Sequence, residues 1–200
     1  MPRPHFQEPR VVSKLGGLTR IERLGLPHPD WRFVTTPREL PEQVWTDAPY
    51  GWTVRCAPSD RYAFWMPSSH HLRFTDIPDA LQRFCQTAAS DYFVVYPSWD
   101  SLLSGSCQVT AGGGSIELVR GEIAALLKGS CSPEVIVDLE PPLYIRRFVR
   151  RGDAETLPCG LIGRLGSAMR LASLEARFVT IEWVWARPGI LCFYDWYQAR

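Results

Sequence analysis

Two apolar segments near the C-terminus, residues 178–186 and 190–197, flank Pro188-Gly189, and each carries one acidic residue. Segments rich in β-branched and aromatic residues on both sides of a turn signal predict a β-hairpin. If the two flanked residues form the turn by themselves, the register pairs Glu182 with Asp195. The two carboxylates then face each other, with their Cβ atoms about 4.5–5.5 Å apart.

A pair of carboxylates at this distance repels unless a cation lies between them or one of them keeps its proton. Mg²⁺ suits such a pair, because it takes one or two protein carboxylates and completes its shell with phosphate oxygens and water. Two alternatives stay open. Both acids point to solvent if the hairpin lies at a sheet edge, and a three-residue loop would shift the register by one residue, since Pro-Gly favours a type II turn.

The rest of the chain alternates helical and extended patterns, which indicates an α+β protein with mostly antiparallel sheets and flanking helices. Residues 13–24 carry an apolar residue at every third position, so we expect a short amphipathic helix with Ser13 as its N-cap. Gly25-Leu26-Pro27 is typical of a helix end. Further helices are expected at 77–89 and 161–177, with a short one in 37–44, and strands at 31–35, 52–56, 92–96, 106–110, 115–120 and 143–149.

Length and composition bound the class of protein. The 200 residues predict one unit, 1–200, which can divide into two small lobes at about 1–90 and 91–200, and residues 1–12 are expected to form a loose proline-rich arm or an edge segment. A formal charge of +1 gives no basic footprint for nucleic acid or an anionic membrane. Without a bilayer-length apolar run or a signal-peptide pattern, no membrane contact is expected. The six scattered cysteines lack metal-ligand spacing and predict reduced thiols in a cytoplasmic protein.

Several short segments follow one another in a suggestive order: SKLGGL at 13–18, GLP at 25–27, TVRC at 53–56, TIEW at 180–183 and QAR at 198–200. They resemble the G-K-G-x-N-L, G-L-P, V-R-S-S, D-I-E-W and Q-A-R segments of one family. This is the ATP-grasp nucleotide-binding domain of phosphoenolpyruvate synthase and pyruvate phosphate dikinase. Ser104-Gly105, with Glu117 and Gly121 after it, loosely follows that family's S-G-V strand pair.

The resemblance implies an ATP-grasp fold with ATP and Mg²⁺ as cofactors. Lys14 takes the place of the family's phosphate-contacting lysine, Arg55 that of its ATP-contacting arginine, and Glu182 that of its magnesium-binding glutamate. The family's metal-binding glutamine corresponds to Asp195 by spacing or to Gln198 by its Ala-Arg context. We prefer Asp195, because the hairpin register independently places it opposite Glu182. Fixed positive charges and a carboxylate-held Mg²⁺ suit phosphate chemistry, which relies on positioning and charge neutralisation.

Glu117 alternates with apolar neighbours in a predicted strand. By the resemblance it is an additional nucleotide-binding residue, on the adenine side or the metal side. The alternative is an exposed strand residue without a ligand.

The first functional hypothesis is therefore an ATP-dependent ligase or phosphotransferase of ATP-grasp type. Such an enzyme uses MgATP to activate a small carboxylate or to phosphorylate a small acceptor, and analogy with stand-alone ATP-grasp proteins favours the ligase. The chain stops soon after the hairpin, so we do not expect the phosphohistidine and pyruvate domains of the full synthases. Besides the small-molecule substrate, a partner protein that supplies missing domains is an expected partner.

Departures from the family favour a second hypothesis. Ser13 and Leu15 replace the glycines around the lysine, and Cys56 and Ala57 replace both serines after the arginine. These changes suit a non-catalytic descendant of the ATP-grasp fold that binds a nucleotide or a partner. A purely structural subunit with an aromatic surface is a third hypothesis.

Three further features each allow two interpretations. The arginines at 146, 147, 150 and 151 either bind an anion or form the solvated side of a strand. The glycines at 112–114 either cradle a phosphate or form a plain hairpin turn. His70-His71 suits acid–base chemistry, but neighbouring histidines point in different directions, which favours an unspecialised loop.

Overall fold

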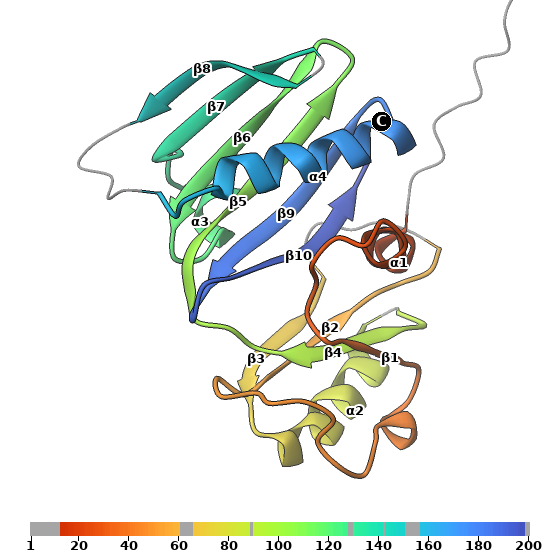
Figure 1. Ribbon diagram of the computed structural model, residues 1–200. Helices are drawn as coiled ribbons and strands as arrows, with labels where there is room; N and C mark the ends of the chain where they lie inside the picture. Colours follow the sequence, from red (N-terminus) through yellow and green to blue (C-terminus); the bar gives the residue numbers. More distant parts are fainter. Residues whose placement is uncertain are drawn as a thin grey trace, which may run out of the picture.

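The computed structural model of the chain describes residues 13–60, 66–88, 90–127, 130–141, 143–150 and 157–198. Two antiparallel sheets, one of four strands and one of six, form the body of these residues, and helices flank them (Figure 1). This is the α+β architecture that the sequence predicts. The predicted arm at residues 1–12, Arg151, and Ala199-Arg200 of the closing segment lie outside the described residues.

The four-stranded sheet comes from the first half of the chain and has the strand order β1-β4-β2-β3. Its strands are β1 (Arg32–Val34), β2 (Trp52–Cys56), β3 (Ser68–Leu72) and β4 (Phe93–Pro97), with the 3-10 helices η1 (Pro37–Glu39) and η2 (Phe74–Asp76) in the connections. Alternate residues of β4 face opposite sides, as the pleat requires. Phe93 and Val95 pack with helix α2 (Ile77–Thr87), whereas Val94 and Tyr96 join the main core. The small sheet therefore lies between α2 and the main core.

The six-stranded sheet has the order β10-β9-β5-β6-β7-β8. Its strands are β5 (Ser101–Thr110), β6 (Gly113–Arg120), β7 (Val135–Glu140), β8 (Tyr144–Arg150), β9 (Val179–Ala186) and β10 (Ile190–Tyr197), with a short helix α3 (Ala124–Leu127) after β6. Helix α4 (Leu161–Glu175) crosses one face of this sheet (Figure 1). Along β9, Ile181 and Trp183 join the main core that α4 covers, whereas Glu182 and Val184 line a cavity on the opposite side. That opposite face carries the candidate site.

Helix α1 (Lys14–Arg23) brings the N-terminal part of the described chain against β10 at the C-terminal hairpin (Figure 1). The Ser13 hydroxyl accepts a hydrogen bond from the Gly16 amide at 3.0 Å, so the predicted N-cap is confirmed. The predicted stop is also confirmed, because Gly25 has φ 63° and the Leu26 amide donates back to the Ile21 carbonyl at 3.1 Å. A Cβ added to Gly17 would lie 2.2 Å from the Trp196 carbonyl oxygen, so only glycine allows this close approach.

The other predicted elements are confirmed within a few residues, and two strands are new. β2 has the predicted bounds, whereas β5 begins at Ser101 instead of residue 106. Strands β3 and β7 are absent from the sequence prediction. β3 is a polar edge strand held by backbone pairing with β2, so it has no hydrophobic pattern to detect. No helix among the described residues is long and apolar enough to cross a membrane.

Candidate functional site

The loop of the C-terminal hairpin differs from the expected two-residue turn. It contains three residues, Arg187, Pro188 and Gly189, and the first pair beyond it is Ala186 with Ile190. Gly189 adopts φ 108° and its amide donates to the Ala186 carbonyl at 2.7 Å, which closes the longer loop. The expectation of a two-residue turn is therefore wrong. With this loop alone, Glu182 and Asp195 would be out of register by one residue.

A β-bulge restores the expected pair. Phe193 pairs with Trp183, but the next registered pair is Asp195 with Glu182, so Tyr194 is the extra residue of β10. The predicted pairing of the two acids is thus confirmed, although the loop and the bulge each shift the register by one and compensate. A bulge next to a functional site commonly changes the direction of a side chain, and here the bulge brings Asp195 into register with Glu182.

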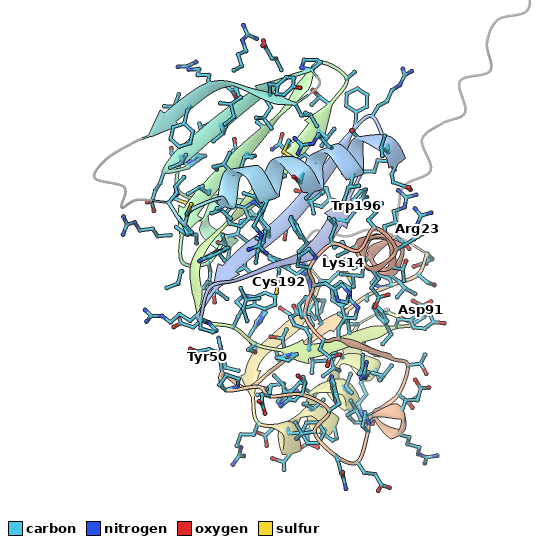
Figure 2. All side chains as sticks on the ribbon, in the orientation of Figure 1. Lys14, Arg23, Tyr50, Asp91, Cys192 and Trp196 are labelled. Carbon is cyan, nitrogen blue, oxygen red and sulfur yellow. The ribbon has the colours of Figure 1, made fainter. Side chains whose placement is uncertain are left out.

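Asp195 is fully buried and holds together three elements of the fold. Its Oδ2 atom accepts hydrogen bonds from Lys14 Nζ of α1 and from Arg55 Nη2 of β2, the latter at 3.0 Å. Its Oδ1 atom accepts from the Trp196 amide at 2.9 Å. Figure 2 labels Lys14 and Trp196 where α1 meets the hairpin. The structure therefore brings together three of the predicted site residues, with the two cations on one carboxylate.

Lys14 has no exposed surface, and Arg55 keeps 15% of its side chain exposed. Burial lowers the pKa of Lys14 well below its usual value, the Arg55 guanidinium lowers it further, and Glu182 raises it. Within this group the formal charges of Lys14 and Arg55 balance those of Asp195 and Glu182. Lys14 and Arg55 are paired with Asp195, and such pairing is what permits charges this deep in the protein.

Glu182 differs from Asp195 in its surroundings. Its side chain is only 3% exposed, yet it makes no hydrogen bond or ion pair with any described residue. It lines a cavity of about 180 Å³ that Arg55 also lines. The carboxylate oxygens of Glu182 are accessible from this cavity, where water, a hydrogen-bond donor or a cation can reach them.

The cavity lies between the two sheets and has walls from both. The small sheet contributes polar residues of β2 and β3, and the large sheet contributes residues of β5, β9 and β10. Tyr96, Trp99 and Tyr194 form an aromatic wall, with ring centroids 5.3 Å apart for Tyr96–Trp99 and 5.2 Å for Trp99–Tyr194. Burial and the neighbouring Glu182 raise the pKa of Tyr194 well above its usual value, so its phenol is neutral at physiological pH.

The histidine pair lies on strand β3 and lines the cavity, so the loop interpretation is wrong. The Thr53 hydroxyl contacts the Ser98 hydroxyl at 2.8 Å and His70 Nδ1 at 3.2 Å, and the His71 amide donates to Ser98. Partial desolvation lowers the pKa of His70; Arg55 and His71 also lower it, and Glu122 opposes them. Sequence reasoning missed this hydroxyl–histidine network, because β3 shows no periodic signal.

Glu117 lies outside the group that surrounds the cavity. It pairs with Ser106, which pairs in turn with Glu182, so two strand spacings of about 4.8 Å separate the two acids on one face of the sheet. Its role in nucleotide binding stays a prediction. Gly105 is explained by packing, because a Cβ added at this position would lie 1.9 Å from the Glu117 carbonyl oxygen.

Comparisons with known proteins give a fold but no family. No protein-family model and no curated protein matches the sequence. A D-alanine–D-alanine ligase from Coxiella burnetii superposes with a TM-score of 0.56 at 11% identity, over 94% of this chain and 47% of that chain. An N5-carboxyaminoimidazole ribonucleotide synthetase in an ADP complex gives 0.56 at 11% identity, over 94% and 44%. The chain has an ATP-grasp fold.

An L-amino acid ligase from Bacillus licheniformis shares this ATP-grasp fold, with a TM-score of 0.53 at 10% identity, over 92% of this chain and 39% of that one. The chain thus spans less than half the length of these three neighbours. They support an ATP-grasp domain but not the narrower phosphoenolpyruvate synthase family that the sequence segments resemble.

Proposed function

We propose that the protein binds MgATP in the cavity between its two sheets and acts as an ATP-dependent ligase. The observation that carries this proposal is the nearly buried Glu182 carboxylate, which makes no hydrogen bond or ion pair with a described residue and lines the same cavity as Arg55 in an ATP-grasp fold. Ligand sites lie preferentially at such interfaces between structural units. An anion that carries its own divalent cation satisfies both side chains at once.

The donor set fits Mg²⁺ brought by a nucleotide better than a permanent metal site. Among the described residues no three His, Cys, Asp or Glu side chains gather as metal ligands. Mg²⁺ needs only one or two protein carboxylates when phosphate oxygens and water complete its shell, and there it neutralises phosphate charge. Glu182 is the proposed first ligand.

Asp195 is the proposed second ligand, and its present contacts define what nucleotide binding has to change. Its Oδ2 atom already accepts from Lys14 and Arg55. We propose that Arg55, which reaches the cavity surface, turns toward the phosphates and so releases one side of Asp195. Lys14, which also pairs with Asp195, is the proposed second phosphate-binding cation.

The size of the cavity adds a requirement. Its volume of about 180 Å³ is below the range of about 300–1,000 Å³ that ligand pockets usually have. Nucleotide binding therefore requires the two sheets to separate, and the Arg55–Asp195 contact is an ion pair between them among the described residues.

Acyl activation is the favoured reaction, because the three neighbours above are ligases or synthetases by name. In that reaction a small carboxylate receives the phosphoryl group of ATP, and an amine then displaces phosphate to form an amide. Phosphoryl transfer to a small acceptor is the competing outcome. In both cases Arg55 and Lys14 stabilise phosphate charge, and the aromatic wall excludes water from one side of the cavity.

Calorimetric titration with MgATP tests the proposal. We expect saturable binding by the wild type and a loss of at least about tenfold in affinity for Glu182→Gln, which keeps the shape and removes the charge. Asp79→Asn is the matched control, because Asp79 is an exposed acid on α2. An absence of MgATP binding by the wild type rejects the proposal.

Lys14 supports a second candidate, a non-catalytic nucleotide-binding protein. Its side chain is completely buried and paired with Asp195, so it does not reach the cavity surface. The two candidates differ in turnover. Release of phosphate from ATP that depends on an added amino acid or other small carboxylate identifies a ligase. Binding of MgATP with neither ATP turnover nor a phosphorylated product supports the non-catalytic protein. A need for a partner that supplies further domains would appear as turnover only after its addition.

A further inference from the structure

Two adjacent arginines on edge strand β8 are turned to the same side by a β-bulge. Asp138 of β7 pairs with Arg147, but Leu139 pairs with Ile145, so Arg146 is the extra residue of β8. In a regular strand neighbouring side chains point to opposite faces. The bulge breaks this alternation, and both arginines line one pocket.

The same pocket is lined by the glycine-rich β5–β6 turn. Its walls include Thr110, Gly112, Gly114 and Ser115 together with Arg146 and Arg147, and its volume is about 480 Å³. The arginine cluster and the glycine turn are far apart in the sequence, but in the structure they line the same pocket. Gly112 leaves open space, since an added Cβ would meet no atom within 4 Å.

The positive charge of this pocket is available. Arg146 and Arg147 are exposed and form no ion pair with any described residue, and the Ser115 hydroxyl has no hydrogen-bond partner among them. Asp138, whose backbone is in register with Arg147, also lines the pocket, and its negative charge offsets one of the two positive charges. The pocket keeps a net charge of +1, and its donors outnumber its acceptors.

We propose that this pocket binds the phosphate group of a small molecule. Two guanidinium groups present planar pairs of N–H donors, and the Ser115 hydroxyl adds another. A phosphate group offers at least three acceptor oxygens to these donors, whereas a carboxylate offers only two. The exposed position suits a small soluble ligand whose remaining part extends into solvent.

This site is separate from the cavity between the sheets. The registered row Thr180–Gln108–Ser115–Asp138–Arg147 crosses four strand spacings, or about 19 Å, and Thr180 is the near neighbour of Glu182 on β9. One phosphate group cannot contact both places, so phosphate binding here goes beyond the proposed nucleotide binding and does not depend on it.

Titration of inorganic phosphate into isotope-labelled protein, followed by amide chemical shifts, tests the site. We expect saturable shifts at Gly112, Gly114 and Ser115, and a loss of at least about tenfold in affinity for Arg146→Ala/Arg147→Ala. The control Arg38→Ala/Arg83→Ala removes the same charge from exposed positions of η1 and α2 and should retain the wild-type affinity. The amide spectrum shows whether each variant is folded.

Other outcomes overturn the proposal. Unchanged affinity in the β8 variant, or an equal loss in the control, means that no specific site exists. Acetate binding as tightly as phosphate rejects the phosphate assignment. Glu182→Gln should keep the phosphate shifts, whereas their disappearance would place the binding in the cavity. A protein that binds phosphate at β8 but not MgATP refutes only the proposed function.

Discussion

The C-terminal hairpin and the β7–β8 edge of the same sheet use one device, a β-bulge, in two different environments. At the hairpin the bulge precedes Asp195, which is fully buried and bound by Lys14 and Arg55. At the edge the bulge presents Arg146 and Arg147 to solvent. Burial makes charges depend on one another, because an unpaired charge in a low-dielectric interior is costly, whereas water screens the exposed arginines.

The largest expected effect is at the buried bulge. Asp195→Ala leaves Lys14 and Arg55 without their shared carboxylate, and we expect a loss of about 3–5 kcal/mol in the free energy of unfolding. Urea denaturation followed by tryptophan fluorescence measures it. A loss below about 1 kcal/mol would show that water or another group readily replaces the carboxylate, and the contrast with the edge would fail.

Glycines near the two bulges give the next contrast. Gly17→Ala places a Cβ 2.2 Å from the Trp196 carbonyl, so α1 must move from β10, at an expected cost of about 1–3 kcal/mol. Gly112→Ala at the edge meets no atom within 4 Å and should change stability by less than about 0.5 kcal/mol. Thermal and urea denaturation measure the free energy of unfolding of both variants. Equal losses in the two variants would contradict the close packing of α1 against β10.

His70 tests an intermediate environment, since it is exposed on one side and lines the cavity on the other. Its pKa in the folded protein should lie below 6.5, and Arg55→Ala should raise it by removing a nearby positive charge. Between the pKa of His70 in the folded protein and its value of 6.5 in the unfolded chain, the unfolded state binds more protons than the folded state. The free energy of unfolding therefore falls as the pH drops below 6.5, and it is regained above this pH. The effect is small because solvent screens the ring. Imidazole resonances followed against pH give the pKa, and a value above 6.5 would contradict this account.

The smallest effect is expected at the exposed bulge. Arg147→Ala removes a solvated charge without a described ion-pair partner, so the free energy of unfolding should change by less than about 0.5 kcal/mol. The same denaturation series as for Asp195→Ala measures it. A loss of several kcal/mol would show that this arginine stabilises the fold and would remove the distinction between the two bulges.

The elements that sequence could predict are those with a local cause. Helix α1 has its cap and its glycine stop within a few residues of its own ends. β2 alternates apolar and polar residues, and α2 shows the helical periodicity of a half-buried element. β7 also carries a usable signal in the buried Val135, Val137 and Leu139, which alternate with less buried residues. β3 carries none, because it is a polar edge strand without a hydrophobic alternation, held by backbone pairing with β2.

The candidate site shows the same division. Glu182 and Asp195 stand out in the sequence as acids within apolar strands, and their pairing is correct. The reason for it was not predictable, because a three-residue loop and a bulge offset each other. Whether the acids bind a metal together stays a prediction, while the hydroxyl–histidine wall of the cavity has no sequence signal.

The sequence by itself determined the α+β class, the caps of α1, the hairpin and the chemical character of its two acids. These depend on contacts within a few residues, which backbone geometry and hydrophobic period control. Only the tertiary structure decided that Lys14 and Arg55 meet on Asp195 and that two arginines share a pocket with a glycine turn. Such meetings depend on bulges and on packing between distant segments, where a shift of one residue reverses the face of a side chain.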